Sequence, residues 1–411
     1  MTIFQVAYKN IVHQFSSSFL GALLSALGTT IFCLILLLSF QLNEQLTLNS
    51  KHIDLVIGAK GSPLQLILNS IYHVDYPTGN IPLEEALALT KSPLVKIAVP
   101  LSMGDNYQGY RIIGTDSSFF KLYGTTVAQG KWWSTDFEAV VGAEVAKEKH
   151  IRVGDKLVGA HGLTSSTDLH ADHPYTVVGI LEKNNSVADK LVLTDLSSVW
   201  HMHEEHHHHH EDESALSHDD DHDIHDLIAL GNHGKEITSM LIQYKNPTAV
   251  AMFPRMVNQT TGMQAASPAL ESARLFSILG IGLDALKFLA VTLMLIAAIS
   301  VFISLYNAFK SRKYELAIMR TMGAARLTLF GIMVIEGIYI TVFGALAGIV
   351  LAHFIMYVIS QVDNTEFITA WQFVKQEIWI VVAAVLLGFI AALLPAIKAY
   401  FTQISKILAE E

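Results

Sequence analysis

The sequence predicts four α-helical membrane spans and a large α+β domain inserted between the first and second of them. Of the 411 residues, 51% are hydrophobic and only 16% are charged, and the mean hydropathy is +0.40. Four runs with almost no charge are long enough to cross a bilayer, which takes about 20 apolar residues. Between the first two runs, short stretches rich in β-branched residues alternate with Gly, Asp and Asn, as in a folded domain.

The apolar runs divide the chain into membrane and solvent segments. No small-residue cleavage site follows the first run, so it is predicted to remain as a span and not to be removed as a signal peptide. The third run is interrupted by Glu336 and is too long for one straight span, so it is expected to extend beyond the bilayer or to kink. The predicted segments are the N-terminal segment with span one (1–43, the apolar run being 19–40), the outer domain (44–287), span two (288–309), a basic segment (310–326), span three (327–362), a short outer loop (363–377), span four (378–397) and the tail (398–411).

Basic residues in the short segments predict the orientation. Segment 310–326 contains five Lys or Arg residues against one acidic residue, Glu315, and the tail contains Lys398 and Lys406. Short loops rich in Lys and Arg remain in the cytoplasm. Both termini are therefore expected inside, and the large domain is expected outside.

The outer domain is predicted to contain both helices and strands. The stretch 81–89 has Pro in its first turn and is typical of a helix, and 247–261 and 268–276 also indicate helices. The stretch 58–76 is interpreted as a structured stalk beside span one. The predicted strands are 96–99, 110–114, 139–141, 156–159, 175–181, 190–193 and 238–244.

Several classes of function are excluded by composition and motifs. A net charge of −10 argues against a nucleic-acid partner, and the single cysteine, Cys33, excludes disulfides within the chain. The sequence has no Walker phosphate-binding loop, no Gly-x-Ser-x-Gly and no His-Glu-x-x-His. The chain is therefore expected not to be an enzyme and to have no catalytic residues.

A stretch rich in histidine and acid residues, 201–226, is the unusual feature of the outer domain. It holds ten Asp or Glu residues and no Lys or Arg. Imidazole and carboxylate groups are ligands of Zn²⁺, so this loop is a candidate metal-binding segment, with the alternative that it is only a solvated polar loop. Its histidines are His201, His203, His206, His207, His208, His209, His210, His218, His222 and His225.

A second, weaker metal candidate precedes the predicted strand at 175–181. It consists of His161, His170 and His173, with Asp168 and Asp172 between them. Such residues are more often ordinary surface polar groups, and this alternative stays open beside the metal hypothesis.

The basic segment contains the most specific motif in the sequence, Lys310-Ser-Arg-Lys-Tyr-Glu-Leu-Ala-Ile-Met-Arg-Thr-Met-Gly-Ala-Ala-Arg326. Helix-forming residues continue to Met322, and Gly323 permits a turn before the next helix. The segment is expected to lie near the membrane surface, with Leu316, Ile318 and Met319 on one side. It resembles the hallmark of FtsX-like ABC permeases, the family that includes MacB and the lipoprotein-releasing LolC and LolE. The order of span, large outer domain and three further spans is similar too.

The resemblance implies that the basic segment is a coupling helix that fits a groove of a separate ABC ATPase. Two permeases, identical or homologous, would act with two ATPase subunits in the bacterial inner membrane, with the large domain in the periplasm and with a periplasmic adaptor or binding protein as a further partner. ATP would be bound by the partner and not by this chain. The expected ATPase contacts are Glu315, Leu316, Met319, Arg320, Gly323 and Ala324.

The resemblance also implies mechanotransmission, in which ATP hydrolysis moves the periplasmic domain to handle a lipoprotein, a lipid, a peptide or a drug. One alternative is a permease for zinc acquisition or sensing that uses the His-rich loop. Another is a regulatory scaffold that controls a periplasmic partner without transport.

Three residues of span three are expected to take part in packing. Glu336 is interpreted as hydrogen-bonded within the bundle near the cytoplasmic interface, although an ionisable residue in a span is a functional candidate by default. Gly344 and Gly348 form a Gly-x-x-x-Gly pattern that allows close helix contact, for example across a dimer.

Overall fold

The computed structural model describes residues 3–13, 15–160, 173–208, 234–362 and 371–401. The chain divides into two compact units. We call residues 1–44 and 278–411 the membrane unit and residues 45–277 the outer unit. Four helices of the described residues are long and apolar enough to span a membrane, and each contains one of the predicted spans. The predicted fold class is confirmed.

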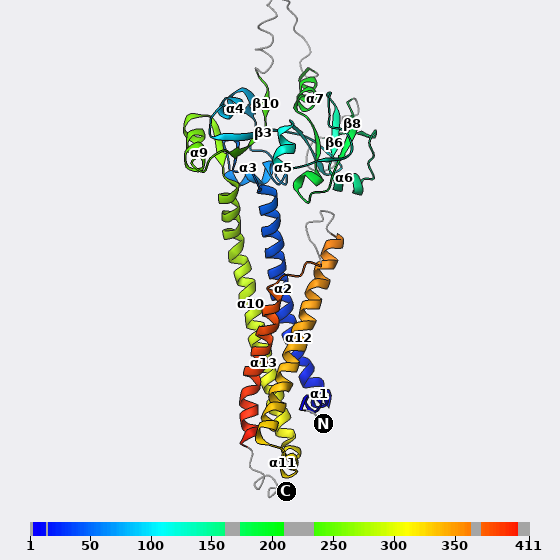
Figure 1. Cartoon of the computed structure of the whole chain (residues 1–411), viewed down its shortest axis with the longest axis vertical. Coiled ribbons are helices and arrows are strands. Elements are labelled where there is room, and N and C mark those ends of the chain that lie inside the picture. The colour runs from blue at the N-terminus through cyan, green and yellow to red at the C-terminus, as the bar shows by residue number, and fades with distance from the viewer. Residues whose placement is uncertain (1–2, 14, 161–172, 209–233, 363–370, 402–411) are drawn as a thin grey trace, which may run out of the picture. The chain divides into compact units, whose positions relative to one another are not determined.

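The helices of the membrane unit are longer than the apolar runs on which the prediction was based. Helix α2 continues past residue 40 because its next ten residues include neither Gly nor Pro. The 37 residues of α12 form one continuous helix, about 55 Å long at 1.5 Å per residue, so this helix extends beyond a bilayer core. The helices with residues in this unit are α1 (Ile3–His13), α2 (Phe15–Ser50), α10 (Pro268–Ser311), α11 (Lys313–Thr321), α12 (Arg326–Val362) and α13 (Glu377–Tyr400) (Figure 1).

Glycines bring the spans into close contact. A β-carbon on Gly344 would lie 2.6 Å from the carbonyl oxygen of Ala22, and one on Gly348 would lie 2.5 Å from that of Ala26. Both contacts are with α2 of the same chain. The pattern was expected to allow close helix contact, for example across a dimer, and in this structure α2 occupies the glycine face of α12.

The outer unit is built on one long mixed sheet. Its strand order is β12-β1-β11-β3-β4-β9-β6-β8-β5, with β7 paired to β8. The pairs β4–β9 and β6–β8 are parallel, and the other pairs of this sheet are antiparallel. A separate two-stranded sheet pairs β10 with β2. The strands are β1 (Leu55–Ala59), β2 (Ile81–Pro82), β3 (Val95–Tyr107), β4 (Tyr110–Thr115), β5 (Val127–Gly130), β6 (Glu138–Val141), β7 (Lys156–Leu157), β8 (Tyr175–Leu181), β9 (Val192–Asp195), β10 (Glu236–Ile237), β11 (Ser239–Tyr244) and β12 (Met263–Ala266).

Short helices cover this sheet and complete its hydrophobic cores. Each of the seven predicted strands overlaps an observed strand, and the helices predicted before span two are α9 and the start of α10. The helix predicted at 81–89 begins only at Leu83, because Ile81 and Pro82 pair with β10. The helices are α3 (Pro63–Ser70), α4 (Leu83–Thr90), α5 (Ser118–Tyr123), α6 (Ala143–Glu148), the 3₁₀-helix η1 (Val187–Lys190), α7 (Leu196–His208) and α9 (Ala249–Thr260).

The interpretation of residues 58–76 as a stalk is wrong. Strand β1 pairs with both β11 and β12, and Leu66 and Ile67 of α3 are buried in the core of the outer unit. Helix α3 packs so closely on β1 that a β-carbon on Gly58 would lie 2.4 Å from Leu66 Cδ1. Pro63 is the first residue of α3, and the side chain of Ser62 caps the start of this helix.

Candidate functional site

The predicted coupling segment forms a sharp junction after span two. Helix α10 ends at Ser311 and α11 begins at Lys313, so only Arg312 separates them. The backbone N–H of Arg312 donates to Ala308 O (3.1 Å), and its carbonyl accepts from Leu316 N (3.0 Å). One residue thus satisfies backbone groups at the end of α10 and at the start of α11.

The other end of α11 is closed by a glycine turn, as the sequence predicts. Gly323 has φ of +100°, in the region that favours glycine. Ala324 N donates to Met319 O (3.0 Å) and Gly323 N donates to Arg320 O (3.1 Å), which is the Schellman pattern. The Arg320 guanidinium adds a hydrogen bond to Ala324 O (3.0 Å). The coupling segment is therefore a short helix with a defined start and end.

The two faces of α11 differ in exposure. Leu316 and Ala317 are 4% and 0% exposed, and Leu316 lies in the hydrophobic core of the membrane unit. On the other face Tyr314, Ile318 and Met322 are 45%, 38% and 83% exposed. Their spacing of four residues places them in one row on a helix. Glu315 is exposed beside this row.

We call Tyr314, Ile318 and Met322 the exposed row. The prediction that Ile318 lies on the same side as Leu316 is wrong, because Leu316 packs inward while Ile318 faces outward. Tyr314 and Met322 were not among the predicted contacts. The i, i+4, i+8 spacing of three apolar residues is the sequence signal that groups them in one row, although it does not say whether the row is buried or exposed.

A buried polar network lies beside the junction. Arg312 Nη1 is 3.3 Å from Glu336 Oε1, and the two side chains are 8% and 2% exposed. The amide of Asn10 donates to the same carboxylate oxygen, and Arg312 Nη2 donates to the carbonyl of Asn10 (3.2 Å). We call these three residues the Glu336 network. Glu336 is thus hydrogen-bonded within the bundle, as the sequence interpretation expected.

A second buried polar pair in the membrane unit lies at the other end of α12. His353 Nε2 is 3.3 Å from Glu377 Oε2, and the Val374 N–H donates to Glu377 Oε1 (3.0 Å). Sequence reasoning did not select these residues. Their signal was the same as for Glu336, because His353 is an ionisable residue inside an apolar run.

The predicted metal ligands are only partly within the described residues. His161, His170 and the histidines from 209 to 225 lie outside them, and His203, His206, His207 and His208 are described by their backbone in α7 only. Side chains are described for His173 and His201. Among the described residues, no three His, Cys, Asp or Glu side chains converge on one possible metal position.

His173 and His201 both adjoin one turn of the outer unit, residues 131–138. His201 Nδ1 is 3.0 Å from Asp136 Oδ2, and the His173 ring stacks on that of Phe137 with centroids 5.4 Å apart. The Phe137 N–H donates to Ser198 Oγ (2.9 Å) in α7. The two histidine-containing stretches, which are separate in the sequence, therefore meet at two consecutive residues.

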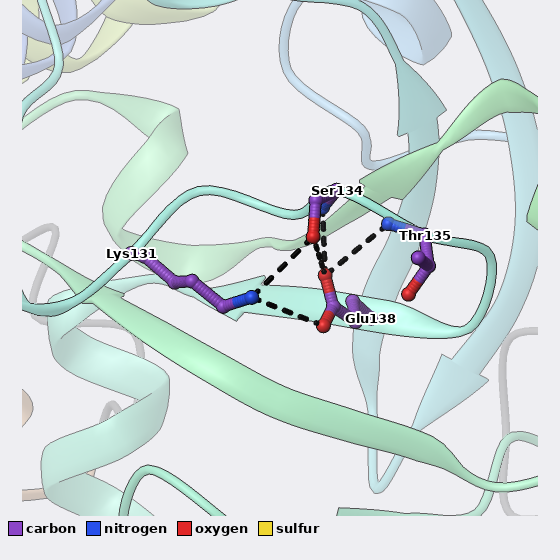
Figure 2. A network of polar contacts seen from close by, with 4 residues as sticks. All are labelled: Lys131, Ser134, Thr135 and Glu138. Atoms are coloured by element: carbon purple, nitrogen blue, oxygen red, sulfur yellow. Dashed lines mark hydrogen bonds and ion pairs between the residues drawn. The ribbon is translucent and has the colours of Figure 1, made fainter.

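Glu138 fixes the shape of this turn, as Figure 2 shows. Its carboxylate accepts from Ser134 N (2.6 Å), Thr135 N (3.3 Å) and Lys131 Nζ (3.4 Å). The hydrogen bond from the Ser134 backbone is the main reason why the pKa of Glu138 lies below its ordinary value. A carboxylate that is ionised at neutral pH thus holds the turn that presents Asp136.

Sequence comparison assigns the chain to a family. The profile of the MacB-like periplasmic core domain matches residues 18–258, and that of the FtsX-like permease C-terminal domain matches residues 287–404. The chain belongs to the FtsX/MacB-like ABC permease family, whose members are membrane subunits that normally work with a separate ATPase. Its four apolar spans and its MacB-like periplasmic domain fit a multi-pass protein of the inner membrane. A search of curated proteins finds no match.

Several solved structures are similar to part of the chain. One is the periplasmic region of MacB from Actinobacillus actinomycetemcomitans, at 10% identity, covering 55% of this chain and 95% of that one with a TM-score of 0.34. Another is the extracellular domain of the noncanonic ABC-type transporter YknZ from Gram-positive bacteria, at 12% identity, 52% and 99% coverage and a TM-score of 0.30. A domain of a putative permease protein from Porphyromonas gingivalis shows 12% identity, 52% and 86% coverage and a TM-score of 0.27.

Proposed function

We propose that this chain is the permease subunit that transmits ATP-driven movement from a cytoplasmic ATPase to its periplasmic domain. The observation that carries the proposal is the construction of α11. One face of this helix is anchored in the membrane unit, both of its ends are fixed by hydrogen bonds, and the opposite face exposes apolar side chains. An exposed apolar row on a rigid support is typical of a protein-binding surface.

In this proposal the expected ATPase contacts fall into two groups according to their exposure. Glu315, Met319, Arg320, Gly323 and Ala324 stay in the proposed contact surface, and the exposed row is added to it. Leu316 is 4% exposed, so its proposed role is to anchor α11 and not to contact the ATPase. The apolar exposed row, with the charged Glu315 and Arg320 beside it, would give the interface an apolar centre and a polar rim.

Two continuous helices offer a route for the movement. Helices α2 and α10 each contain residues of both units, without a break between the span and the outer residues. Because helices are stiff along their axis, displacement of span two by α11 would be carried along α10. In this proposal the termini and α11 are cytoplasmic, two copies or a homologous pair act on two ATPases, and the substrate is a lipoprotein, lipid, peptide or drug handled outside the spans.

The direct test is co-purification of the full chain with its ATPase, comparing Met322→Asp with Met252→Asp. Both methionines are exposed, Met322 at 83% directly after the last residue of α11 and Met252 at 64% on α9 of the outer unit. We expect the α11 variant to lose the ATPase and the α9 variant to retain it. Equal recovery of the ATPase with both variants would refute the proposal.

A second candidate function, zinc acquisition or sensing, is favoured by the meeting of His173 and His201 at one turn. The imidazole of His201 and the carboxylate of Asp136 are ligand types of Zn²⁺. Zinc would be bound by the loop 201–226 together with this turn. Deleting residues 201–226 should then impair growth under zinc chelation while growth in zinc-replete medium is unchanged. Unchanged growth under chelation would remove this candidate.

A further inference from the structure

We infer that the N-terminal helix α1 is part of the coupling apparatus, and that Glu336 is the positioning residue that joins it to the coupling helix. Through the Glu336 network, movement of α11 would be passed to α12 and α1 together, besides the direct path along α10. This inference rests on the proposed function, because it assumes that the ATPase acts on α11. It assigns a mechanical role to a buried charge inside the bundle.

Two separate parts of the chain converge on the carboxylate of a third. Glu336 Oε1 receives both the Arg312 guanidinium and the Asn10 amide, and Arg312 also binds the backbone of Asn10. Asn10 lies on α1, whose Ala7 is fully buried and whose Ile11 packs against the same core as Leu316. Helix α1 is therefore fixed to the bundle by apolar contacts as well as by the network.

Arg312 is the residue that links α10 to the start of α11. Its backbone closes both α10 and α11, so the residue moves with the junction. Its side chain is 8% exposed and its partner Glu336 is 2% exposed. Separating a buried ion pair leaves charges without partners in a poorly solvated site, which is strongly unfavourable. The guanidinium and the carboxylate should consequently move together.

The position of Glu336 on α12 explains how the movement would spread. The next residue, Gly337, packs so closely on α13 that a β-carbon would lie 2.8 Å from Gly388 O and 2.8 Å from Ala392 Cβ. Spans three and four are therefore in tight contact at the level of the network. A displacement delivered to Glu336 would reach both of these spans, while α1 would follow through Asn10.

The competing explanation is that Arg312 and Glu336 only support the fold. Replacing both by apolar residues distinguishes this explanation from a role in transmitting movement. Exchanging a buried ion pair for apolar side chains of similar volume commonly preserves or raises stability. The double variant Arg312→Met with Glu336→Leu should therefore fold, whereas Glu336→Gln alone leaves Arg312 without its counter-charge. If the pair only supported the fold, the double variant would behave as the unsubstituted chain.

The experiment uses the full-length chain in complex with its ATPase, reconstituted in lipid nanodiscs. ATP hydrolysis per assembled complex is measured for the unsubstituted chain, the double variant and Asn10→Ala. Spin labels on Lys9 and Lys313, both exposed and outside the proposed ATPase contact surface, report the α1–α11 distance in a Cys33→Ser background. We expect the double variant to assemble but to change permease-dependent hydrolysis about two- to thirtyfold, the range for residues that modulate coupling without touching a ligand. We also expect Asn10→Ala to broaden the distance distribution.

Two outcomes overturn the inference. One is an assembled double variant with unchanged hydrolysis, and the other is an unchanged distance distribution in Asn10→Ala. Either result, together with loss of the ATPase in Met322→Asp, would remove the role of the network and leave the proposed function standing. Retention of the ATPase in Met322→Asp would instead remove the proposed function itself.

Discussion

Gly344 of α12 lies so close to Ala22 of α2 that a β-carbon at position 344 would be 2.6 Å from the Ala22 carbonyl oxygen. Because this neighbour is backbone, it cannot move aside without shifting the helix. Gly331, on the same helix, has no neighbouring atom within 4 Å of its would-be β-carbon. The two glycines therefore form a matched pair for testing close packing between spans one and three.

We predict opposite effects for alanine at these positions. Gly344→Ala should lower the free energy of unfolding by about 1–3 kcal/mol, the usual cost of overpacking. Gly331→Ala should leave stability unchanged or raise it by up to about 1 kcal/mol, because alanine favours a helix. Thermal unfolding of the purified chain in detergent measures both. Equal effects of the two variants would contradict the observed contact with α2.

The glycine at the end of α11 gives a second prediction. Gly323 has φ of +100° and lies outside any close contact, so only its backbone conformation restricts substitution. Gly323→Val should cost about 1–2 kcal/mol locally, since a left-handed conformation is unfavourable for residues with a β-carbon. Gly323→Asn should be better tolerated.

The measurement is the stimulation of ATP hydrolysis in the reconstituted complex. We expect stimulation to be highest with Gly at position 323, lower with Asn and lowest with Val. A valine variant as active as the asparagine variant would show that the Schellman turn after α11 has no part in coupling.

A buried histidine of the outer unit gives a prediction on pH. His73 is 7% exposed, and burial, followed by the positive charge of Arg111, lowers its pKa from 6.5 to about 3. Between these two values the unfolded chain binds a proton that the folded chain does not. The stability of this region should therefore fall as the pH is lowered from 6.5 toward 3.

The comparison of His73→Asn with His150→Asn isolates this effect. Both histidines have positive φ, 55° and 54°, but His150 is exposed. Over the pH window, His73→Asn should make the slope of stability against pH shallower by up to about 1.4 kcal/mol per pH unit. Hydrogen exchange of residues 63–75, followed across this pH range, measures the slope. Parallel slopes for the unsubstituted chain and His73→Asn would show that the imidazole is not kept neutral by burial.

The turn that carries Asp136 gives a prediction on metal binding. If Asp136 and His201 join a zinc site, Asp136→Asn should weaken the tightest Zn²⁺ binding step of the purified chain about tenfold or more, as loss of a carboxylate partner does in other metal sites. Calorimetric titration with Zn²⁺ measures the affinity, with His150→Asn as the control. Identical isotherms for the three proteins would exclude this turn from metal binding.

Local patterns in the sequence sufficed for the spans and for most strands of the outer unit, because apolar runs and β-branched stretches report burial directly. These local patterns failed where a strand pairs with another strand that is far away in the sequence. Residues 58–76 were interpreted as a stalk, but they include the end of β1, whose partners β11 and β12 lie far along the chain at 239–244 and 263–266. Ile81 was likewise predicted to be in a helix, but it pairs with β10, which lies about 150 residues later in the chain.

The candidate site shows the same division. The helix after span two and its glycine end could be predicted from residue types alone. Which face of α11 is buried depends on where Leu316 meets the bundle, and this cannot be derived from a nine-residue helix. Likewise, Glu336 was identifiable as an ionisable residue in a span, but its pairing with Asn10 and Arg312 requires three segments to meet in space.

The most direct test of the central claim is site-specific photo-crosslinking in cells. A photoreactive phenylalanine analogue is placed at Ile318 of the exposed row or, as the control, at Met252 of the outer unit. We predict that position 318 crosslinks to the ATPase and position 252 does not. Absence of an ATPase adduct at 318, or accessibility of α11 to a protease added from the periplasmic side, would contradict the assignment of α11 as the coupling helix.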